Sequence, residues 1–559
     1  MMLFKKFSLA ILFISGIFID TFSVNYKYDY LYQILPFKMD YVSEPVIPKL
    51  EENITIYGGI GDGLVLNTDA FAKAMKSLSA KGGGHLIVPS GVWLTGPIVF
   101  CSNIDLHLEK GALILFTTDI SQYPIVNANY EGQETRRCQS PVSGQNLQNI
   151  SITGEGTIDG SGQVWRALKK NKVTESEWLK LTSNGGIIEK STWYPSEKFM
   201  KGEKLSKTNV PQANLTDQQW EDIKDFLRPV MISFISCKNL MLRGVLFENS
   251  PNWNIHPLLC ENVIIDEVFV KNPAYAQNGD GIDLESCKNA LIINSTLDVG
   301  DDAICIKSGK DAEGRKRGKA TENVIVDNCK VFQGHGGFVV GSEMSGGVRN
   351  ISVTNCQFIG TDTGLRFKST RGRGGVVENI YVSNIYMFNI VNDSFLFDLY
   401  YGGRSASEDL VLNKDKSQTV ATEVIADETT PCFRNIYVKN LVSNNARRAM
   451  FFNGLPEMNI SNINVENATI SAKLGAEIVE SDGINLKNVT VIPAQGPAFK
   501  LNNVKNFNAS DLKYPSDLKQ PFVITGDKTK NISLPLTTVN KNLVQYSEQI
   551  NQKEIVFKK

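Results

Sequence analysis

The chain has 559 residues, of which 42% are hydrophobic and 21% are charged, and its formal net charge is −1 at pH 7. This balance argues against a nucleic-acid-binding protein, because such proteins usually carry a large basic excess. It is compatible with a polyanionic substrate, since a small cationic patch in a groove can be offset by acidic residues elsewhere. The length allows several ordinary domains or one elongated solenoid.

The first two dozen residues have the pattern of a secretory signal. Two lysines precede an apolar run over residues 7–19, and Thr21 and Ser23 provide small residues for cleavage. We therefore expect residues 1–24 to be a signal peptide and the protein to be exported, to the periplasm or beyond the cell. The apolar run is short for a membrane span, and no later stretch approaches ~20 consecutive apolar residues.

Residues 25–125 are expected to form an N-terminal cap and the first coils of a solenoid. A helix is predicted from Asn67 to Ser79, because apolar residues recur there at helical spacing and three glycines follow. Thr68 and Asp69 are available at its start. Such a helix would cover the open first coil of the repeat that follows.

A polar segment at residues 163–228 reads as an insertion in that repeat. The spacing of Thr174 with Glu177, and of Thr216 with Gln219, is that of a capping box, so two short helices are predicted. The tryptophans of the segment are Trp165, Trp178, Trp193 and Trp220. They would either form a stacking wall for a sugar or pack in a local core.

One short phrase, an asparagine followed by alternating apolar residues, recurs through most of the chain. Copies begin at Asn149, Asn239, Asn262, Asn289, Asn323, Asn350, Asn379, Asn435 and Asn462. Each resembles a short strand closed by turn residues. Strands this short cannot bury a face alone, whereas parallel stacking of successive coils lines their inward residues into one core. A leucine-rich repeat is disfavoured, because its leucine spacing and regular helix are missing.

The repeat therefore predicts an all-β fold, a right-handed parallel β-helix over residues 126–510, followed by a C-terminal tail at residues 511–559. The recurring asparagines are expected to stack from coil to coil and to bond turn backbone. Five cysteines, at positions 237, 260, 287, 329 and 356, lie beside apolar runs at similar intervals. This placement favours buried free thiols over disulfides.

The residues with candidate chemistry are concentrated between Asn278 and Lys368. Four motifs follow one another at coil spacing: Asn278-Gly279-Asp280, Asp301-Asp302, Gly334-His335-Gly336-Gly337 and Arg366-Phe367-Lys368. If each lies at an equivalent point of its coil, the motifs stack into one patch, with strands ~4.8 Å apart.

Glycosidic hydrolysis requires one carboxylic acid for the leaving oxygen and a second carboxylate that activates water or attacks the sugar. Asp280, Asp301 and Asp302 are three candidates, and crowding of like charges raises at least one pKa. A local bend is required, because adjacent residues of a strand point to opposite faces. The alternative is that these are ordinary turn aspartates.

His335 would hold the acid's geometry and proton, or would be a turn histidine bonded to backbone. Arg366 and Lys368 share one strand face and suit a uronate carboxylate. Arg371 and Arg373 are expected to be solvated surface. We expect no metal and no cofactor, because neither a cysteine-histidine ligand spacing nor a calcium-loop pattern occurs.

The four motifs in this order resemble those of glycoside hydrolase family 28, the polygalacturonase family, in its bacterial exo-acting form. The likeness covers residues 45 to about 500 and includes four further segments: Gly300-Asp301-Asp302, Ile306-Lys307-Ser308-Gly309, Gly341-Ser342-Glu343 and Gly364-Leu365-Arg366. Gly279 and Phe367 depart from the residues common in the family, and both are expected to point away from the sugar.

The resemblance implies that Asp301 is the general acid, that Asp280 and Asp302 activate the attacking water, and that His335 supports the acid. It also implies that Asn278, Arg366 and Lys368 contact sugar. The family's groove tyrosine aligns best with Tyr401, with Tyr400 as the alternative. Carboxylates one coil apart fit a retaining pair by separation, whereas the resemblance implies inversion.

The expected function is hydrolysis of α-1,4-galacturonosidic linkages in pectin by a monomer. The long insertion favours attack from a chain end, because it would wall off one end of a groove. Alternatives are a rhamnogalacturonan or xylogalacturonan hydrolase, a pectate lyase on the same solenoid, or a non-catalytic glycan-binding β-helix. No nucleic acid and no membrane partner is expected.

Overall fold

The computed structural model describes residues 26–183, 185–206, 208–402 and 425–558. The chain divides into two units, Met1–Pro36 and Phe37–Lys559. In the first, helix α1 (Asp29–Tyr32) follows Tyr26, whose ring packs edge-on against Tyr28. The expected signal peptide lies outside the described residues. No helix within the described ranges is long and apolar enough to cross a membrane.

The second unit begins with the expected cap helix, which is confirmed as α2 (Thr68–Ala80). Its inward face buries Phe71, Met75 and Leu78, so it closes the core at the first rungs. Neither expected capping residue has that role: the N-cap position is Asn67, whose side chain bonds the backbone of neighbouring turns instead of the helix.

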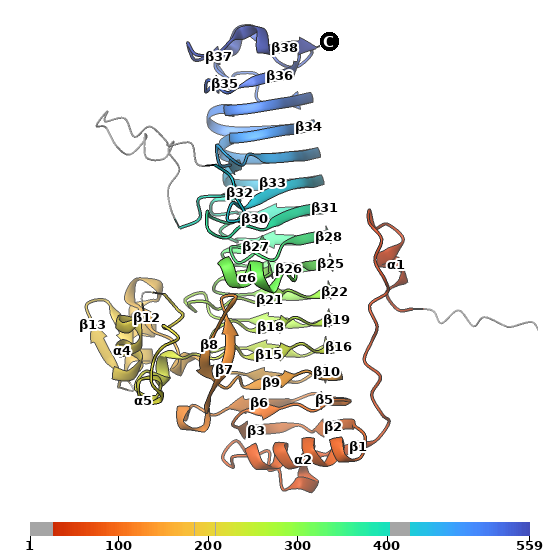
Figure 1. Cartoon of the computed structure of the whole chain (residues 1–559), viewed down its shortest axis with the longest axis vertical. Coiled ribbons are helices and arrows are strands. Elements are labelled where there is room, and N and C mark those ends of the chain that lie inside the picture. Colours follow the sequence, from red (N-terminus) through yellow and green to blue (C-terminus); the bar gives the residue numbers. More distant parts are fainter. Residues whose placement is uncertain (1–25, 184, 207, 403–424, 559) are drawn as a thin grey trace, which may run out of the picture. The chain divides into compact units, whose positions relative to one another are not determined.

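The rungs consist of short strands that pair in parallel from coil to coil (Figure 1). A first ladder contains β1 (Glu51–Asn53), β2 (Gly84–Val88), β5 (Ile104–Leu108), β10 (Gln148–Gly154), β16 (Lys238–Arg243), β19 (Glu261–Asp266), β22 (Lys288–Ile293), β25 (Thr321–Asp327), β28 (Val348–Thr354) and β31 (Val376–Phe388). A second contains β3 (Gly91–Thr95), β6 (Ala112–Phe116), β11 (Thr157–Asp159), β17 (Leu246–Glu248), β20 (Phe269–Lys271), β23 (Thr296–Asp298), β26 (Lys330–Phe332) and β29 (Gln357–Ile359).

The third ladder carries the candidate site. It contains β4 (Ile98–Val99), β9 (Val142–Gln145), β15 (Ile232–Ile235), β18 (Ile255–Leu258), β21 (Ile282–Glu285), β24 (Asp302–Lys307), β27 (Gly336–Val340), β30 (Leu365–Lys368) and β32 (Asp393–Asp398). β33 (Cys432–Asn453) and β34 (Ile460–Lys513) each run through more than one face.

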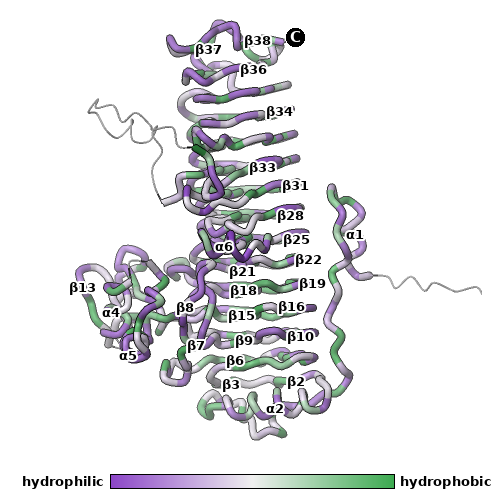
Figure 2. Tube along the Cα trace, in the orientation of Figure 1, coloured by the Kyte–Doolittle hydropathy of each residue, from purple (hydrophilic) through white to green (hydrophobic). Residues whose placement is uncertain are grey.

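This parallel pairing confirms the predicted β-helix. Register is set by the core, because a slip of one residue would turn every inward side chain outward. Ile265, Ile292 and Val326 face one another on successive rungs and are fully buried. Hydrophobic and hydrophilic residues alternate along the rungs in Figure 2, as strands with one buried face require.

Residues 511–559, which the sequence analysis treats as a tail, extend the repeat. They contain β35 (Phe522–Thr525), β36 (Lys530–Pro535), β37 (Val544–Tyr546) and β38 (Ile555–Lys558). β35 and β36 pair in parallel with β34, and β37 and β38 pair with them in turn. The asparagine ladder continues here, since Asn531 donates to Asn506, 25 residues earlier, at 3.0 Å; the sequence analysis followed the repeated phrase only to Asn462.

The recurring asparagines stack from coil to coil, as expected, but the bonds that join them run between side chains and not to turn backbone. They adopt positive φ, for example 57° at Asn239 and 57° at Asn262, a region that asparagine tolerates better than most residues. The Asn262 amide donates to Asn239 Oδ1 at 3.0 Å, and the Asn239 amide donates to Asn149 at 2.9 Å. They thus bond one another's side chains. The five repeat cysteines are free and buried, as expected.

The insertion contains helices α3 (Glu175–Thr182), α4 (Glu197–Leu205) and α5 (Asp217–Glu221) and strands β12 (Leu168–Lys169), β13 (Ile187–Glu189) and β14 (Thr192–Tyr194). Both predicted capping boxes are present. All four tryptophans of the insertion are buried, mostly in clusters of its own. They therefore pack locally and do not form a wall for a sugar.

A hairpin that the sequence analysis does not anticipate precedes β9. β7 (Ile125–Tyr130) and β8 (Gln133–Cys138) pair antiparallel and run across the rungs in Figure 1. The ring of Tyr130 lies 4.8 Å from that of Trp253, directly before β18. The hairpin tip reaches the segment around helix α6 (Asp311–Arg317), which follows β24.

Replacing one ladder asparagine tests the two effects that these residues combine. Asn323 has a φ of 59° and bonds Asn289 and Asn350 at 3.1 Å each. We expect Asn323→Ala to destabilise the protein by about 2 kcal/mol, through lost hydrogen bonds and left-handed strain. Asn323→Gly, which relieves the strain, should cost about half as much. Urea unfolding midpoints measure both; an equal loss would contradict the backbone contribution.

Candidate active site

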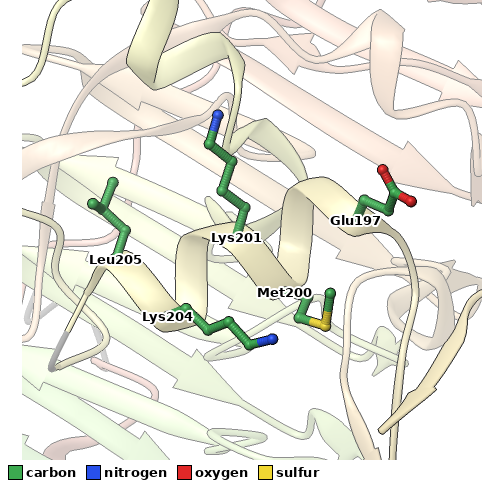
Figure 3. Close-up of a pocket in the computed structure, with 5 residues that line it drawn as sticks. All are labelled: Glu197, Met200, Lys201, Lys204 and Leu205. Atoms are coloured by element: carbon green, nitrogen blue, oxygen red, sulfur yellow. The ribbon is translucent and has the colours of Figure 1, made fainter.

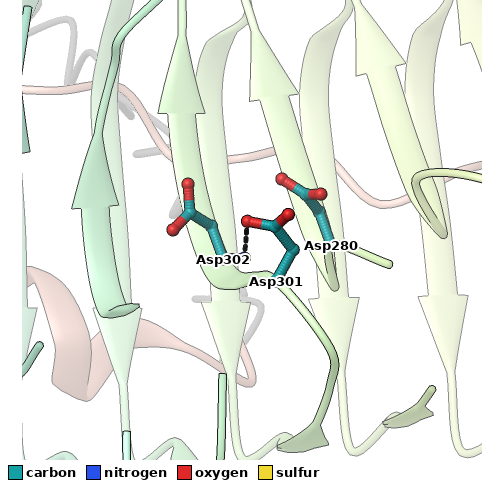
Figure 4. A group of neighbouring side chains, drawn as sticks. All are labelled: Asp280, Asp301 and Asp302. Carbon is teal, nitrogen blue, oxygen red and sulfur yellow. Dashed lines mark hydrogen bonds between the residues drawn. The ribbon is translucent and has the colours of Figure 1, made fainter. Parts of the chain in front are cut away.

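The structure brings the three expected aspartates together. Asp280 ends the loop before β21, Asp301 lies in a bend before β24, and Asp302 begins that strand. Each offers a carboxylate oxygen within 4.8 Å of the other two (Figure 4). The backbone N–H of Asp302 donates to Asp301 Oδ1 at 3.0 Å. This is the local bend that lets adjacent residues reach the same side.

Asp302 is held by two cations. Arg366 Nη1 donates to its Oδ1 at 2.9 Å, and Lys368 Nζ donates to its Oδ2 at 2.7 Å. Burial alone would raise the pKa of Asp302, but Lys368 and Arg366 hold it below its ordinary value. Asp302 is therefore ionised. Arg366 and Lys368, expected to face a substrate carboxylate, contact this aspartate in the structure.

Asp280 has the opposite environment. It is buried, and its Oδ1 has no hydrogen-bond partner among the described residues. Burial raises its pKa well above the ordinary value, and the charges of Asp283 and Asp301 raise it further. Two carboxylates a few ångströms apart thus differ in protonation, so side chains of one type can have different roles in one site.

His335 lies beside Asp301, as expected. Its Nδ1 is 2.9 Å from Asp301 Oδ1, and its Nε2 is 4.0 Å from Asp362 Oδ2. The hydrogen bond to Asp301 raises the pKa of His335, against the opposing effect of burial. The imidazole is 41% exposed, so this corner of the cluster is open to a ligand.

The uncertainty between the two tyrosines is resolved by their contacts. The Tyr401 ring centroid lies 4.7 Å from Lys368 Nζ, and the ring is 38% exposed. Tyr400 instead lies against Arg371 and packs on the core. Tyr401 is therefore the tyrosine at the cluster.

Asn278 is half-buried, and its Oδ1 accepts a hydrogen bond from Arg228 at 2.9 Å.

The sequence analysis does not select a buried ion cluster behind the aspartates. Lys307 Nζ lies 3.0 Å from Glu343 Oε2, 3.5 Å from Asp283 Oδ1 and 4.6 Å from the ring centroid of Trp253. Burial alone would raise the pKa of Glu343, but Lys307 and then Arg373 lower it to about 2. The sequence contained a signal for the outward position of Lys307. Ile304 and Ile306 point into the core, and because side chains of a strand alternate between its faces, Lys307 must point outward.

The other basic residues are engaged elsewhere. Arg371 pairs with Glu457, and Arg373 pairs with Asp311, so neither contributes to the aspartate cluster. Phe367 is fully buried in the core, pointing away from the site as expected.

The spacing of the three aspartates also suits a cation, but two positive side chains already bind Asp302, which disfavours a metal there.

The outer face on one side of the cluster is covered. Arg317 donates to Glu285 of β21 at 2.6 Å and to the Gly132 carbonyl of the hairpin tip at 3.5 Å. Lys310 pairs with Glu131 at 3.3 Å, and Asn209 of the insertion donates to the same glutamate at 2.6 Å. Hairpin, α6 and insertion are thus tied together next to the rung of Asp280.

A hollow lies elsewhere on the surface, beside α4 of the insertion (Figure 3). It is lined by Glu197, Met200, Lys201, Lys204 and Leu205. All of these belong to one helix, and none of the aspartates borders it. Because it offers no pair of carboxylates, we place the active site at the aspartate cluster.

Residues 212–430 match the family model described as glycosyl hydrolases family 28. The chain is 28% identical over 475 residues to the probable polygalacturonase of Vitis vinifera, covering 82% of this chain and 83% of that protein. It is 28% identical to the exo-poly-alpha-D-galacturonosidase of Dickeya chrysanthemi over 395 residues, 68% of this chain and 63% of that protein.

Among solved structures, a hyperthermoactive exopolygalacturonase from Thermotoga maritima matches with a TM-score of 0.63 and 32% identity. The match covers 81% of this chain and 94% of that one. The polygalacturonase of Erwinia carotovora shares the fold with a TM-score of 0.54 at 20% identity. These likenesses confirm the predicted right-handed parallel β-helix.

The lowered pKa of Glu343 predicts a pH-dependent contribution to stability. Because the folded pKa, about 2, lies below the ordinary glutamate value of about 4.3, the contribution is complete above the ordinary value and is lost as the pH falls toward 2. Glu343→Gln should therefore lower the unfolding midpoint at pH 6, with a gap that narrows by pH 3. A constant gap would contradict this account. Glu155→Gln, in an exposed pair, is the control.

Proposed function

The chain belongs to glycoside hydrolase family 28 and is a glycosidase, and on this premise we propose that it hydrolyses α-1,4-galacturonosidic linkages of polygalacturonan from chain ends. The observation that carries the proposal is the aspartate cluster, in which one carboxylate is held ionised by two cations and another is held protonated. The names of the similar proteins from Vitis, Dickeya and Thermotoga support the substrate.

In the proposed mechanism, Asp301 donates a proton to the glycosidic oxygen. It is the most accessible of the three aspartates, with 20% of its side chain exposed, and so lies where a sugar can reach it. His335 is within hydrogen-bonding distance of Asp301 and remains protonated to higher pH than a free histidine. It can therefore orient the carboxyl group and return its proton between turnovers.

Asp302 would deprotonate the water that attacks the anomeric carbon, and Asp280 would help to hold that water. Asp302 is an ionised acceptor fixed on both oxygens, and Asp280 retains an oxygen without a partner in the described chain. The separation of the carboxylates, within 4.8 Å, would by the general rule favour retention. We propose inversion, because Asp302 is immobilised by two cations and is poorly placed to become a nucleophile.

Lys368, Arg366 and Tyr401 would contact the sugar on the leaving-group side. Lys368 and Arg366 neutralise Asp302 and together leave one positive charge in excess, which favours a uronate over a neutral sugar. The exposed Tyr401 ring, packed on Lys368, offers a flat apolar surface for a sugar ring. Asn278 would contact the sugar on the other side of the cleaved bond.

Attack from a chain end is supported by the covered face beside Asp280. The hairpin tip, α6 and the insertion are linked there by Glu131, Lys310, Arg317 and Asn209. Such a wall would limit how far a bound polymer can extend past the aspartates. The similar Dickeya and Thermotoga proteins bear names of end-acting enzymes.

A second candidate is a hydrolase of xylogalacturonan or rhamnogalacturonan, which would use the same carboxylates on a decorated chain. The wall disfavours branched substrates, because side chains near the end would collide with it. A lyase would need a base and commonly calcium, whereas the aspartates here fit hydrolysis. A polymeric substrate outside the cell fits export, and we propose that the protein acts there as a monomer.

The three aspartates should be required for turnover but not for folding. Asp301→Asn should lower kcat on polygalacturonate by roughly a hundred- to ten-thousand-fold, since general acid catalysis contributes that much. Asp280→Asn should act similarly, because it removes a carboxyl group that holds the attacking water. Reducing-sugar release and circular dichroism measure activity and fold. Asp517→Asn, at an exposed position, is the control; wild-type activity in Asp301→Asn would refute its assignment.

The first product identifies both the mode of attack and the stereochemistry. We expect galacturonate monomer from the earliest time points, because the wall admits only a chain end, and we expect the β-anomer, because inversion converts an α-linkage. Chromatography and proton NMR of early samples measure these properties. Mixed oligomers would contradict end attack, an α-anomer would contradict inversion, and an unsaturated product would indicate a lyase.

A further inference from the structure

Arg228 is a buried cation directly behind the substrate-facing loop. It lies between the insertion and β15 and is only 4% exposed. Its guanidinium donates to the carbonyl of Gln277 at 2.9 Å, to that of Pro251 at 3.3 Å and to Asn278 Oδ1 at 2.9 Å. No carboxylate of the described residues forms an ion pair with it. A buried positive charge is costly unless such acceptors surround it.

This contact determines which way the Asn278 amide points. A guanidinium has only donors, so the side-chain oxygen of Asn278 must face Arg228 and the NH₂ group must face away. That NH₂ group donates to no acceptor in the described part of the chain. Asn278 is half-buried, has a φ of 53° and lies two residues before Asp280. Its two free donors are therefore next to the aspartate cluster.

Arg228 is in turn held by the wall beside the site. Arg137 of β8 donates from Nε to the Arg228 carbonyl at 3.0 Å and from Nη1 to the Asn209 carbonyl at 2.9 Å. The Arg137 guanidinium lies 4.1 Å from the ring centroid of Tyr130. A continuous set of contacts thus leads from the hairpin and the insertion through Arg228 to Asn278.

We propose that Arg228 is a positioning residue that fixes the Asn278 amide as a donor to a carboxylate oxygen of the bound uronate. The proposal rests on the proposed function. It explains how the hairpin and the insertion would act on the same sugar as the aspartates. With its oxygen turned to Arg228, Asn278 presents its NH₂ group, which only donates, to the sugar. The uncompensated charge of Arg228 strengthens the polarity of the amide toward an anion.

The test separates donor from acceptor at Asn278. Asn278→Asp keeps an oxygen for Arg228 but has no donor, so it should lower kcat/KM on oligogalacturonate by roughly 10- to 100-fold while retaining the wild-type unfolding midpoint. Asn278→Ala should lose similar activity. Arg228→Met should also lower kcat/KM and should add little to the loss in Asn278→Ala, because it acts through that residue. Arg434→Met, in an exposed pair, is the control.

Wild-type kcat/KM in Asn278→Asp would overturn the donor assignment. Losses that multiply in the Arg228→Met/Asn278→Ala double variant would show that Arg228 acts independently, which also overturns the proposal. If Arg228→Met does not fold, Arg228→Lys keeps the charge without the planar fork, and the same non-additivity is expected with an intermediate loss. Failure of the wild-type protein to release galacturonate would instead refute the proposed function.

Discussion

The parallel stacking of rungs is the constraint on which the rest of this molecule depends. Successive rungs lie one strand spacing apart, about 4.8 Å. The buried core prevents the strands of neighbouring rungs from slipping in register. Residues such as Asp280 and Asp302, more than twenty positions apart in the chain, therefore become neighbours. The same stacking aligns Arg366 and Lys368 with Asp302. The proposed active site is thus a consequence of the repeat and not of any one loop.

Electrostatics then gives different properties to side chains of the same type. Asp302 lies between two cations and has a lowered pKa, whereas Asp280 is buried near two other carboxylates and has a raised one. Lys307, paired with Glu343 and near Asp283, provides a positive charge beneath them. Because such a cluster is buried, removing one member leaves another unpaired. The proposed catalytic residues therefore lie in the same charged network as Lys307 and Glu343.

The wall beside the site joins segments that are distant in sequence. The hairpin β7–β8, the insertion and α6 meet at Glu131, and Arg137 connects the hairpin to Arg228 and hence to Asn278. The tryptophans of the insertion pack in clusters formed mostly by its own residues. The hairpin, the insertion and α6 would therefore have two effects together: they would restrict the length of a bound polymer, and they would orient its terminal sugar.

The sequence by itself determined the solenoid, the cap helix, both capping boxes and the membership of the aspartate cluster, because local periodicity and the coil interval are written in the order of residues. The sequence analysis did not anticipate the last strands, which lie beyond Asn462, the last repeat that it identified, or the hairpin. Only the tertiary structure decided that Arg366 and Lys368 bind Asp302, that Tyr401 and not Tyr400 reaches the cluster, and that Arg228 orients Asn278. These depend on side-chain direction and on contacts between segments whose separation follows no repeat.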